Sequence, residues 1–144
     1  MFFLKELPSE KIMARYARRF PEMDIDKTRK ALHMMRDASL LIRDLENYFR
    51  SHDISMTRFL ILIVLDREPE AQAFTITDLV KRLDISKPVM TTTVKRLEND
   101  SMVRLEQNNI DSRYKTIQIT NHGRAKIEKI MPGYYKIINQ HMRQ

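Results

Sequence analysis

The feature that most constrains the fold of this chain is residues 86–123, which place a capped helix, two short strands and a polar loop in one order. Ser86 is a favourable N-cap residue, and Pro88 falls in the first turn, where its missing N–H removes no helical hydrogen bond. A helix is therefore expected to begin here. Its inward stripe would consist of the residues that recur at helical spacing, which are Met90, Thr93, Val94 and Leu97.

The opposite face of this helix is short-chained and basic. It carries Lys87, Thr91, Thr92, Lys95 and Asn99. Such a face can enter a DNA major groove, about 12 Å wide, where hydroxyl and ammonium groups reach base edges and phosphates. The same pattern is also typical of an ordinary solvated helix face, so this helix alone does not establish DNA binding.

A hairpin is expected downstream of the helix. Residues 103–106 and 115–119 have the composition of short strands, and the second stretch alternates apolar and polar residues. Residues 107–114 would then form the loop between the strands. Arg113 in such a loop can enter the neighbouring minor groove, because narrow A·T stretches attract arginine through their negative potential. Asp111 would repel DNA if it were unpaired, so we interpret it as a structural partner of the loop or of Arg113.

The first half of a helix-turn-helix is expected immediately upstream. Residues 75–83 would form its helix with Thr77 as N-cap, and residues 74–76 would form a single strand. The turn would be residues 84–86, within the 3 to 4 residues that usually join the two helices. Glycine often occupies the left-handed position of such a turn. Here Asp84 occupies it, and aspartate tolerates this backbone region better than most residues do.

From about Leu45 to the C-terminus the chain resembles the MarR family of bacterial winged-helix regulators, named for multiple antibiotic resistance regulation. The resemblance rests on Ser55 with the apolar helix after it, Thr75-x-Thr77-x-Leu79, Val94-x-x-Leu97-Glu98, Asp111-x-Arg113 and Ile119-Thr120-x-x-Gly123-Arg124. Two positions depart from the pattern. Ser101 replaces a glycine ahead of the strand at 103–106, and Leu105 replaces an arginine on that strand, with Arg104 beside it. These departures concern the geometry and contacts of the wing more than the fold.

The resemblance implies a mainly α fold with a small β-hairpin wing, that is, a winged helix-turn-helix with N- and C-terminal dimerisation helices. Residues 1–53 would form N-terminal helices of the dimer frame, 54–123 the DNA-binding region, and 124–144 the C-terminal dimerisation helices. The protein would then be a sequence-specific transcription regulator. The expected DNA-binding residues are Ser86, Lys87, Thr91, Thr92, Lys95, Arg96, Asp111, Arg113 and Lys115.

The rest of the chain predicts a helical frame. Ser55 would cap a helix through about Asp66 that is apolar almost all round, as a central buried helix should be. After the hairpin, Thr120 would cap a helix that Pro132-Gly133 breaks or kinks. A helix over 27–51 is expected to bury one face. That face comprises Ala31, Met34, Met35, Ala38, Leu41, Ile42, Leu45 and Phe49.

Both ends of the chain carry apolar stripes, and the N-terminal stripe would lie on a helix that starts at Pro8 or Ser9 and stops near Pro21. These stripes could pack on their own domain or pair with a second subunit, and the resemblance favours pairing. In a homodimer, two recognition helices related by a two-fold axis read an inverted repeat with half-sites about one helical turn apart. The expected dimerisation residues are Ile12, Tyr16, Phe20, Tyr134, Ile137 and Ile138.

Composition excludes several other classes of protein. The net charge of +7 favours attraction to phosphate, and the absence of cysteine excludes disulfides, thiolate metal sites and cysteine-based oxidant sensing. The four histidines are scattered, and no catalytic constellation is recognisable, so we expect no enzymatic activity, no metal and no cofactor. The longest apolar run, residues 59–65, is far shorter than the roughly 20 residues of a membrane-spanning helix. With no secretory signal recognisable, the expected location is the cytoplasm.

Two other functions fit the sequence. A winged helix can serve protein association, and the N-terminal segment with Arg15, Arg18 and Arg19 could bind an acidic partner or a membrane surface. The reading region could also bind DNA as an architectural protein without sequence preference. For the main hypothesis, the resemblance implies a small-molecule effector in a cleft between reader and frame. The available residues there are Met34, Met35, Arg58 and Phe59, although methionine also suits irregular core gaps.

Overall fold

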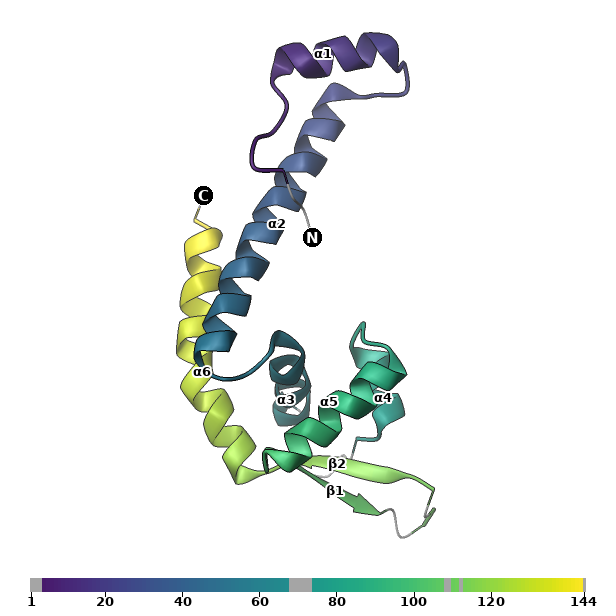
Figure 1. Cartoon of the computed structure of the whole chain (residues 1–144), viewed down its shortest axis with the longest axis vertical. Coiled ribbons are helices and arrows are strands. Elements are labelled where there is room, and N and C mark those ends of the chain that lie inside the picture. The colour runs from purple at the N-terminus through teal and green to yellow at the C-terminus, as the bar shows by residue number, and fades with distance from the viewer. Residues whose placement is uncertain (1–3, 68–73, 108–109, 112, 144) are drawn as a thin grey trace. The chain divides into compact units, whose positions relative to one another are not determined.

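The computed structural model describes residues 4–67, 74–107, 110–111 and 113–143. Of the expected wing loop at 107–114, residues 108, 109 and 112 lie outside the described residues. The described part of the chain forms six helices and one antiparallel hairpin, so the expected mainly α winged-helix fold is confirmed (Figure 1). The elements are α1 (Glu10–Arg19), α2 (Ile25–Ser51), α3 (Met56–Arg67), α4 (Ile76–Arg82), α5 (Lys87–Asn99), β1 (Val103–Gln107), β2 (Lys115–Ile119) and α6 (Asn121–His141).

The chain divides into two compact units. The first, the frame unit, comprises Met1–Leu45 and Ile137–Gln144, and the second, the reading unit, comprises Glu46–Lys136. Helices α2 and α6 each contribute residues to both units. The reading unit contains all of the helix-turn-helix and hairpin region that the sequence analysis identified.

Helix α3 forms the centre of the reading unit. Phe59, Ile61 and Leu62 are fully buried, and the helix packs against α4, α5 and β2. The ring of Phe59 lies 4.4 Å from that of Phe49 and 5.1 Å from that of Tyr134, measured between centroids. A helix that is apolar all round must be covered on every side, which is why the shorter elements of this unit assemble around it.

Side-chain caps fix the starts of the helices. Ser55 Oγ accepts from the N–H of Arg58 at 3.2 Å, and Thr120 Oγ1 accepts from the N–H of Gly123 at 3.1 Å, so both expected caps are confirmed. The expected cap at Thr77 is wrong, because α4 is capped by Thr75, two residues earlier.

A reciprocal pair of hydrogen bonds explains the earlier start of α4. Thr75 Oγ1 accepts from the N–H of Asp78 at 3.2 Å, and the Asp78 carboxylate accepts from the N–H of Thr75 at 2.9 Å. The two side chains thus satisfy two backbone donors that a helix start would otherwise leave unpaired. The Thr75 N–H, followed by its hydroxyl, lowers the pKa of Asp78 below its ordinary value. Phe74, just before the cap, forms an isolated β-bridge with Ile117, so the strand expected at 74–76 is confirmed at its first residue alone, because Thr75 is the N-cap and Ile76 begins α4.

The turn of the helix-turn-helix is built without a left-handed residue. Positive φ among the described non-glycine residues occurs at Asp53 and Ser101, so the expected left-handed Asp84 is wrong. Leu83 ends α4 in extended backbone, with φ −123° and ψ 137°, and its carbonyl accepts from the N–H of Ile85 at 2.8 Å. This tight contact between residues two apart reverses the chain in the manner of an inverse γ-turn, which needs no positive φ.

Helix α6 continues through Pro132 to His141, so of the expected break or kink the break is wrong. Proline removes one backbone donor but does not end the helix when neighbouring packing holds it. Here the Tyr48 hydroxyl donates to the carbonyl of Ile130 at 2.8 Å, and a Cβ at Gly133 would overlap that hydroxyl. Gly133 therefore admits a close approach of Tyr48 to α6.

The frame unit has a small core and large exposed apolar surfaces. Ser9 caps α1, Met13 is buried, and Arg29 on α2 contacts Glu10 at 2.7 Å. At the other end of the unit, His141 lies 2.8 Å from Asp44. The expectation that α2 buries one whole face is wrong, because the stripe is buried at its end but exposed at Met34, Met35, Ala31, Ala38 and Ile42.

The C-terminus of α5 predicts a stabilising substitution. Ser101 has φ 59°, its N–H donates to Glu98 O, and the N–H of Met102 donates to Leu97 O, which is a Schellman motif with serine in place of the usual glycine. Ser101→Gly removes the left-handed strain, and we expect it to raise the free energy of unfolding by about 0.5 to 1 kcal/mol in urea titrations. The matched control is Ser86→Gly, where φ is −63°, because no strain is relieved there. Equal effects of the two substitutions would contradict this account.

Candidate nucleic-acid interface

Helix α5 is mounted on the core by one face and exposed on the other. Met90, Val94 and Leu97 are at most 1% exposed, and they lie on the face of α5 that packs against α3 and α4. The residues predicted to face outward are all exposed, and they are Lys87, Thr91, Thr92, Lys95 and Asn99. Ser86 and Arg96 are exposed as well. Ser86 occupies the N-cap position, but its side chain makes no capping hydrogen bond.

The threonines of α5 direct their hydroxyl protons back into the helix. Thr91 Oγ1 donates to Lys87 O at 2.9 Å, and Thr92 Oγ1 donates to Pro88 O at 3.0 Å. A hydroxyl that donates to the preceding turn keeps its acceptor capacity, and its methyl group remains for apolar contact. The cationic donors of this face are therefore lysine and arginine, while the threonines offer acceptors and methyl groups.

The wing is a two-stranded hairpin in which Arg104 braces the two strands. Arg104 lies opposite Gln118 in the register, and its Nη2 and Nε donate to Gln118 Oε1 at 2.6 and 3.0 Å. Arg104 also pairs with Glu106 at 3.1 Å. Cross-strand polar pairs of this kind stabilise a short ladder. Lys115 is exposed at the start of β2, where the loop returns to the sheet.

Asp111 and Arg113 form the contact that the sequence analysis expected. The Asp111 carboxylate accepts from Arg113 Nε at 3.0 Å, from Nη2 at 2.9 Å and from the backbone N–H at 3.1 Å. The Arg113 side chain lowers the pKa of Asp111, and Asp111 raises the pKa of Arg113. Because a lowered carboxyl pKa keeps the pair charged, the contact is complete at neutral pH and is lost only as the pH falls through that lowered pKa.

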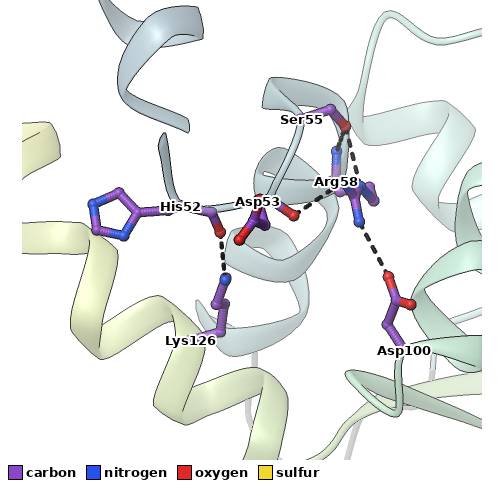
Figure 2. A network of polar contacts seen from close by, with 6 residues as sticks. All are labelled: His52, Asp53, Ser55, Arg58, Asp100 and Lys126. Carbon is purple, nitrogen blue, oxygen red and sulfur yellow. Dashed lines mark hydrogen bonds and ion pairs between the residues drawn. The ribbon is translucent and has the colours of Figure 1, made fainter. Parts of the chain in front are cut away.

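Arg58 links the end of the recognition helix to the turn between α2 and α3 (Figure 2). Its guanidinium donates to the Asp100 carboxylate at 3.1 Å and to Asp53 O at 3.2 Å, and its side chain is 15% exposed. Asp100 is the C-cap residue of α5. On the other side of the same turn, Lys126 Nζ donates to His52 O. We call Arg58, Asp53 and Asp100 the Arg58 clamp.

The four residues expected at an effector cleft have different roles. Phe59 is fully buried in the core of the reading unit, and Arg58 belongs to the Arg58 clamp. Met34 and Met35 are exposed in the frame unit. A sequence signal for the clamp did exist, since Asp100 is an acid at a helix end, but its partner lies 42 residues away.

The expected dimerisation residues also divide between the two units. Ile12, Tyr16 and Phe20 are exposed on and just after α1, in the frame unit. Ile137 and Ile138 are half-buried in the same unit. Tyr134 is half-buried in the reading unit, where its ring packs on Phe59.

The part of the chain that the structure describes holds neither a metal-ligand cluster nor a membrane-spanning helix. No three histidine, aspartate or glutamate residues in that part of the chain come together as metal ligands would. No described helix is both long enough and apolar enough to cross a membrane.

Comparisons with known proteins agree on one family. A family model described as MarR family matches residues 52–113. The chain is 26% identical over 136 residues to the HTH-type transcriptional repressor YetL of Bacillus subtilis, covering 94% of this chain and 81% of that protein. It is 30% identical over 91 residues to the HTH-type transcriptional regulator TcaR of Staphylococcus aureus, covering 62% and 56%.

Solved structures share the fold. Sco3205, a MarR family transcriptional regulator from Streptomyces coelicolor solved in complex with DNA, superposes with a TM-score of 0.76 at 21% identity, covering 83% of this chain and 74% of that one. BpsR of Bordetella bronchiseptica, whose DNA binding is regulated by 6-hydroxynicotinic acid, superposes with a TM-score of 0.66 at 18% identity, covering 78% and 83%.

The Arg58 clamp predicts a stability effect. Arg58→Gln removes hydrogen bonds from Asp100 and from Asp53 O, so we expect it to lower the free energy of unfolding by about 1 to 2 kcal/mol in urea titrations at fixed protein concentration. The matched control is Arg50→Gln, because Arg50 is exposed and its side chain contacts Asn47 at the surface. The control should change stability by less than about 0.5 kcal/mol. A loss no greater than that of the control would contradict the role of the clamp.

Proposed function

The chain belongs to the MarR family of transcription regulators, and we propose that it works as a homodimer that reads an inverted-repeat DNA operator. The observation that carries the proposal is the one-sided burial of α5. Its apolar face is locked against the core by Met90, Val94 and Leu97, so its polar and basic face is held outward in one orientation. A helix that is fixed in this way can enter a major groove without losing its own packing.

The proposed interface has two kinds of contact, with phosphates and with base edges. Lys87, Lys95 and Arg96 are exposed cations on α5, and phosphate neutralisation by such groups supplies affinity that falls steeply with salt. Ser86, Thr91 and Thr92 are the exposed short polar residues that we assign to base edges or phosphates near the start of the helix.

The wing adds a second contact region. Arg113, which Asp111 holds in a bidentate contact, is assigned to the minor groove, and Lys115 is assigned to the adjacent phosphates. The Asp111 contact limits the conformations of Arg113 before DNA arrives. A side chain that is ordered in advance loses less conformational entropy on binding. Asp111 can therefore favour DNA binding although its own charge repels DNA.

The frame unit supplies the surface for pairing. Ile12, Tyr16 and Phe20 are exposed, and a groove of about 700 Å³ on α2 is lined by residues that include Met34, Leu41 and Met142. Exposed apolar surface of this extent marks an interaction site more often than a solvated face. We assign it to a second copy of the chain, because an inverted repeat requires two recognition helices related by a two-fold axis.

The proposal includes modulation of DNA binding by a small-molecule effector. The regulated DNA binding of BpsR supports this extension by analogy. In this chain, Phe59 is committed to the core and Arg58 to the clamp, so an effector would be expected to contact Met34 and Met35 in place of those two side chains.

The proposed function is tested by selecting the purified protein against a random duplex library at near-physiological salt and sequencing the retained DNA. We expect enrichment of an inverted repeat whose half-sites lie about one helical turn apart. Retention without enrichment would support architectural binding, because phosphate contacts carry no sequence information. No retention of DNA would favour the protein- or membrane-association hypothesis.

The Asp111–Arg113 contact gives a prediction whose sign differs from that of simple charge counting. Asp111→Ala removes a negative charge near DNA, yet we expect weaker binding to the selected operator, because Arg113 loses the partner that orders it. Arg113→Ala should weaken binding most at operators with A·T-rich flanks. Affinity is measured by titration of labelled operator, with Glu46→Ala, an exposed acid on α2 in the reading unit, as the control for net charge. Unchanged or tighter binding by Asp111→Ala would refute the positioning role.

A further inference from the structure

Val89 is the exception among the large apolar side chains of α5. It is 51% exposed, whereas Met90, Val94 and Leu97 on the same helix are buried, and α5 is described along its whole length. A single exposed apolar residue is ordinary on a protein surface, so its position has to carry the argument. Val89 lies in the first turn of α5, which is the part of a recognition helix that meets base edges.

The neighbours of Val89 place it on the exposed basic side of the helix. Thr92 and Arg96 follow it by three and seven residues, so the three side chains form one stripe along the helix surface. Lys87 and Lys95 are exposed on the same helix. The apolar side chain therefore shares a stripe with Thr92 and Arg96, on a helix whose exposed cations suit a polyanion, which argues for DNA over an apolar protein partner as its occupant.

Several groups at the start of α5 offer no hydrogen-bond donor to a base, although the side chains of Ser86 and Lys87 do. Pro88 has no N–H, Thr92 Oγ1 donates to Pro88 O, and Thr93 Oγ1 donates to Val89 O at 2.7 Å. The group in the major groove that needs neither donor nor acceptor is the C5 methyl of thymine, and apolar side chains contact it directly.

We propose that Val89 determines sequence specificity by contacting the C5 methyl group of one thymine in each half-site. This inference rests on the proposed function, because it needs an operator. In this arrangement the lysines hold the helix against the phosphates and the valine distinguishes thymine from the other bases by burying its methyl group. Cytosine, which lacks that methyl group, would leave the valine against water or a polar base edge.

The test compares thymine with deoxyuridine, which lacks only the C5 methyl group. Each thymine of one half-site of the selected operator is replaced singly, and the affinity of the wild-type protein and of Val89→Ala is measured for every duplex. At one position we expect the wild type to lose about fourfold in affinity, which corresponds to the burial of one methyl group at about 0.8 kcal/mol. Val89→Ala should bind the thymine operator more weakly and should lose most of the difference between thymine and deoxyuridine at that position.

Two further variants separate the methyl contact from general effects on the interface. Val89→Thr keeps one methyl group at a similar shape and should retain part of the difference between thymine and deoxyuridine. Ile110→Ala removes an exposed apolar side chain from the wing loop and should leave the full difference at the same thymine. Thermal unfolding of each variant checks that the fold is intact, and the exposure of Val89 makes a large stability change unexpected.

The outcomes separate this inference from the proposed function. If an operator is enriched but the loss at every thymine is the same for wild type and Val89→Ala, the inference is overturned and the proposed function stands. A wild-type protein that is insensitive to deoxyuridine at all positions overturns it equally. If the selection yields no operator, the proposed function fails first and the inference falls with it.

Discussion

The packing of α5 on α3 is the interaction on which the rest of the reading unit depends. Helix α3 is apolar on nearly every side, so α4, α5 and β2 must all cover it. Because Met90, Val94 and Leu97 satisfy this demand, the remaining face of α5 is free of any structural requirement and can be polar, basic and exposed. The outward direction of the recognition residues is thus a consequence of core formation, and no separate interaction is needed to fix it.

The end of α5 is held by a cluster of backbone contacts that joins three elements. Ser101 O accepts from Thr120 Oγ1 at 2.6 Å, and Met102 O accepts from the N–H of Thr120 at 3.0 Å, so the start of α6 is tied to the residues between α5 and β1. A Cβ at Gly123 would overlap Met102 O, which explains a glycine in the first turn of α6. With the Arg58 clamp on its other side, the C-terminal end of α5 is fixed from two directions. Movement of the recognition helix would therefore have to involve the α2–α3 turn or the start of α6.

The sequence predicted the helices, the hairpin and the exposed face of α5, because these follow from local periodicity and capping residues. It failed where the answer depended on contacts between distant positions. The contact of Arg58 with Asp100 joins positions 42 residues apart, and an apolar run does not reveal that Phe59 is the residue at its centre. The choice of Thr77 over Thr75 was a local error, since Asp78 stands three residues after Thr75. Polarity identifies the outer face of a helix, so the exposure of Val89 has no sequence signal of its own.

Charge and shape have separate roles at the interface. In the proposed function, the net charge of +7 and the exposed lysines of α5 attract any duplex, and this attraction weakens with salt. The wing pair of Asp111 and Arg113 adds no net charge, so it contributes little to that general attraction. It contributes a fixed position of the Arg113 side chain, and such a side chain gains most binding affinity where the width of the minor groove matches that position. Nonspecific affinity should therefore depend mainly on the α5 cations, whereas preference between sequences depends on the neutral surface of α5 and on the ordered wing. A regulator that searches a genome needs both kinds of affinity. Attraction to every sequence shortens the search, and only the additional affinity for the operator selects the site.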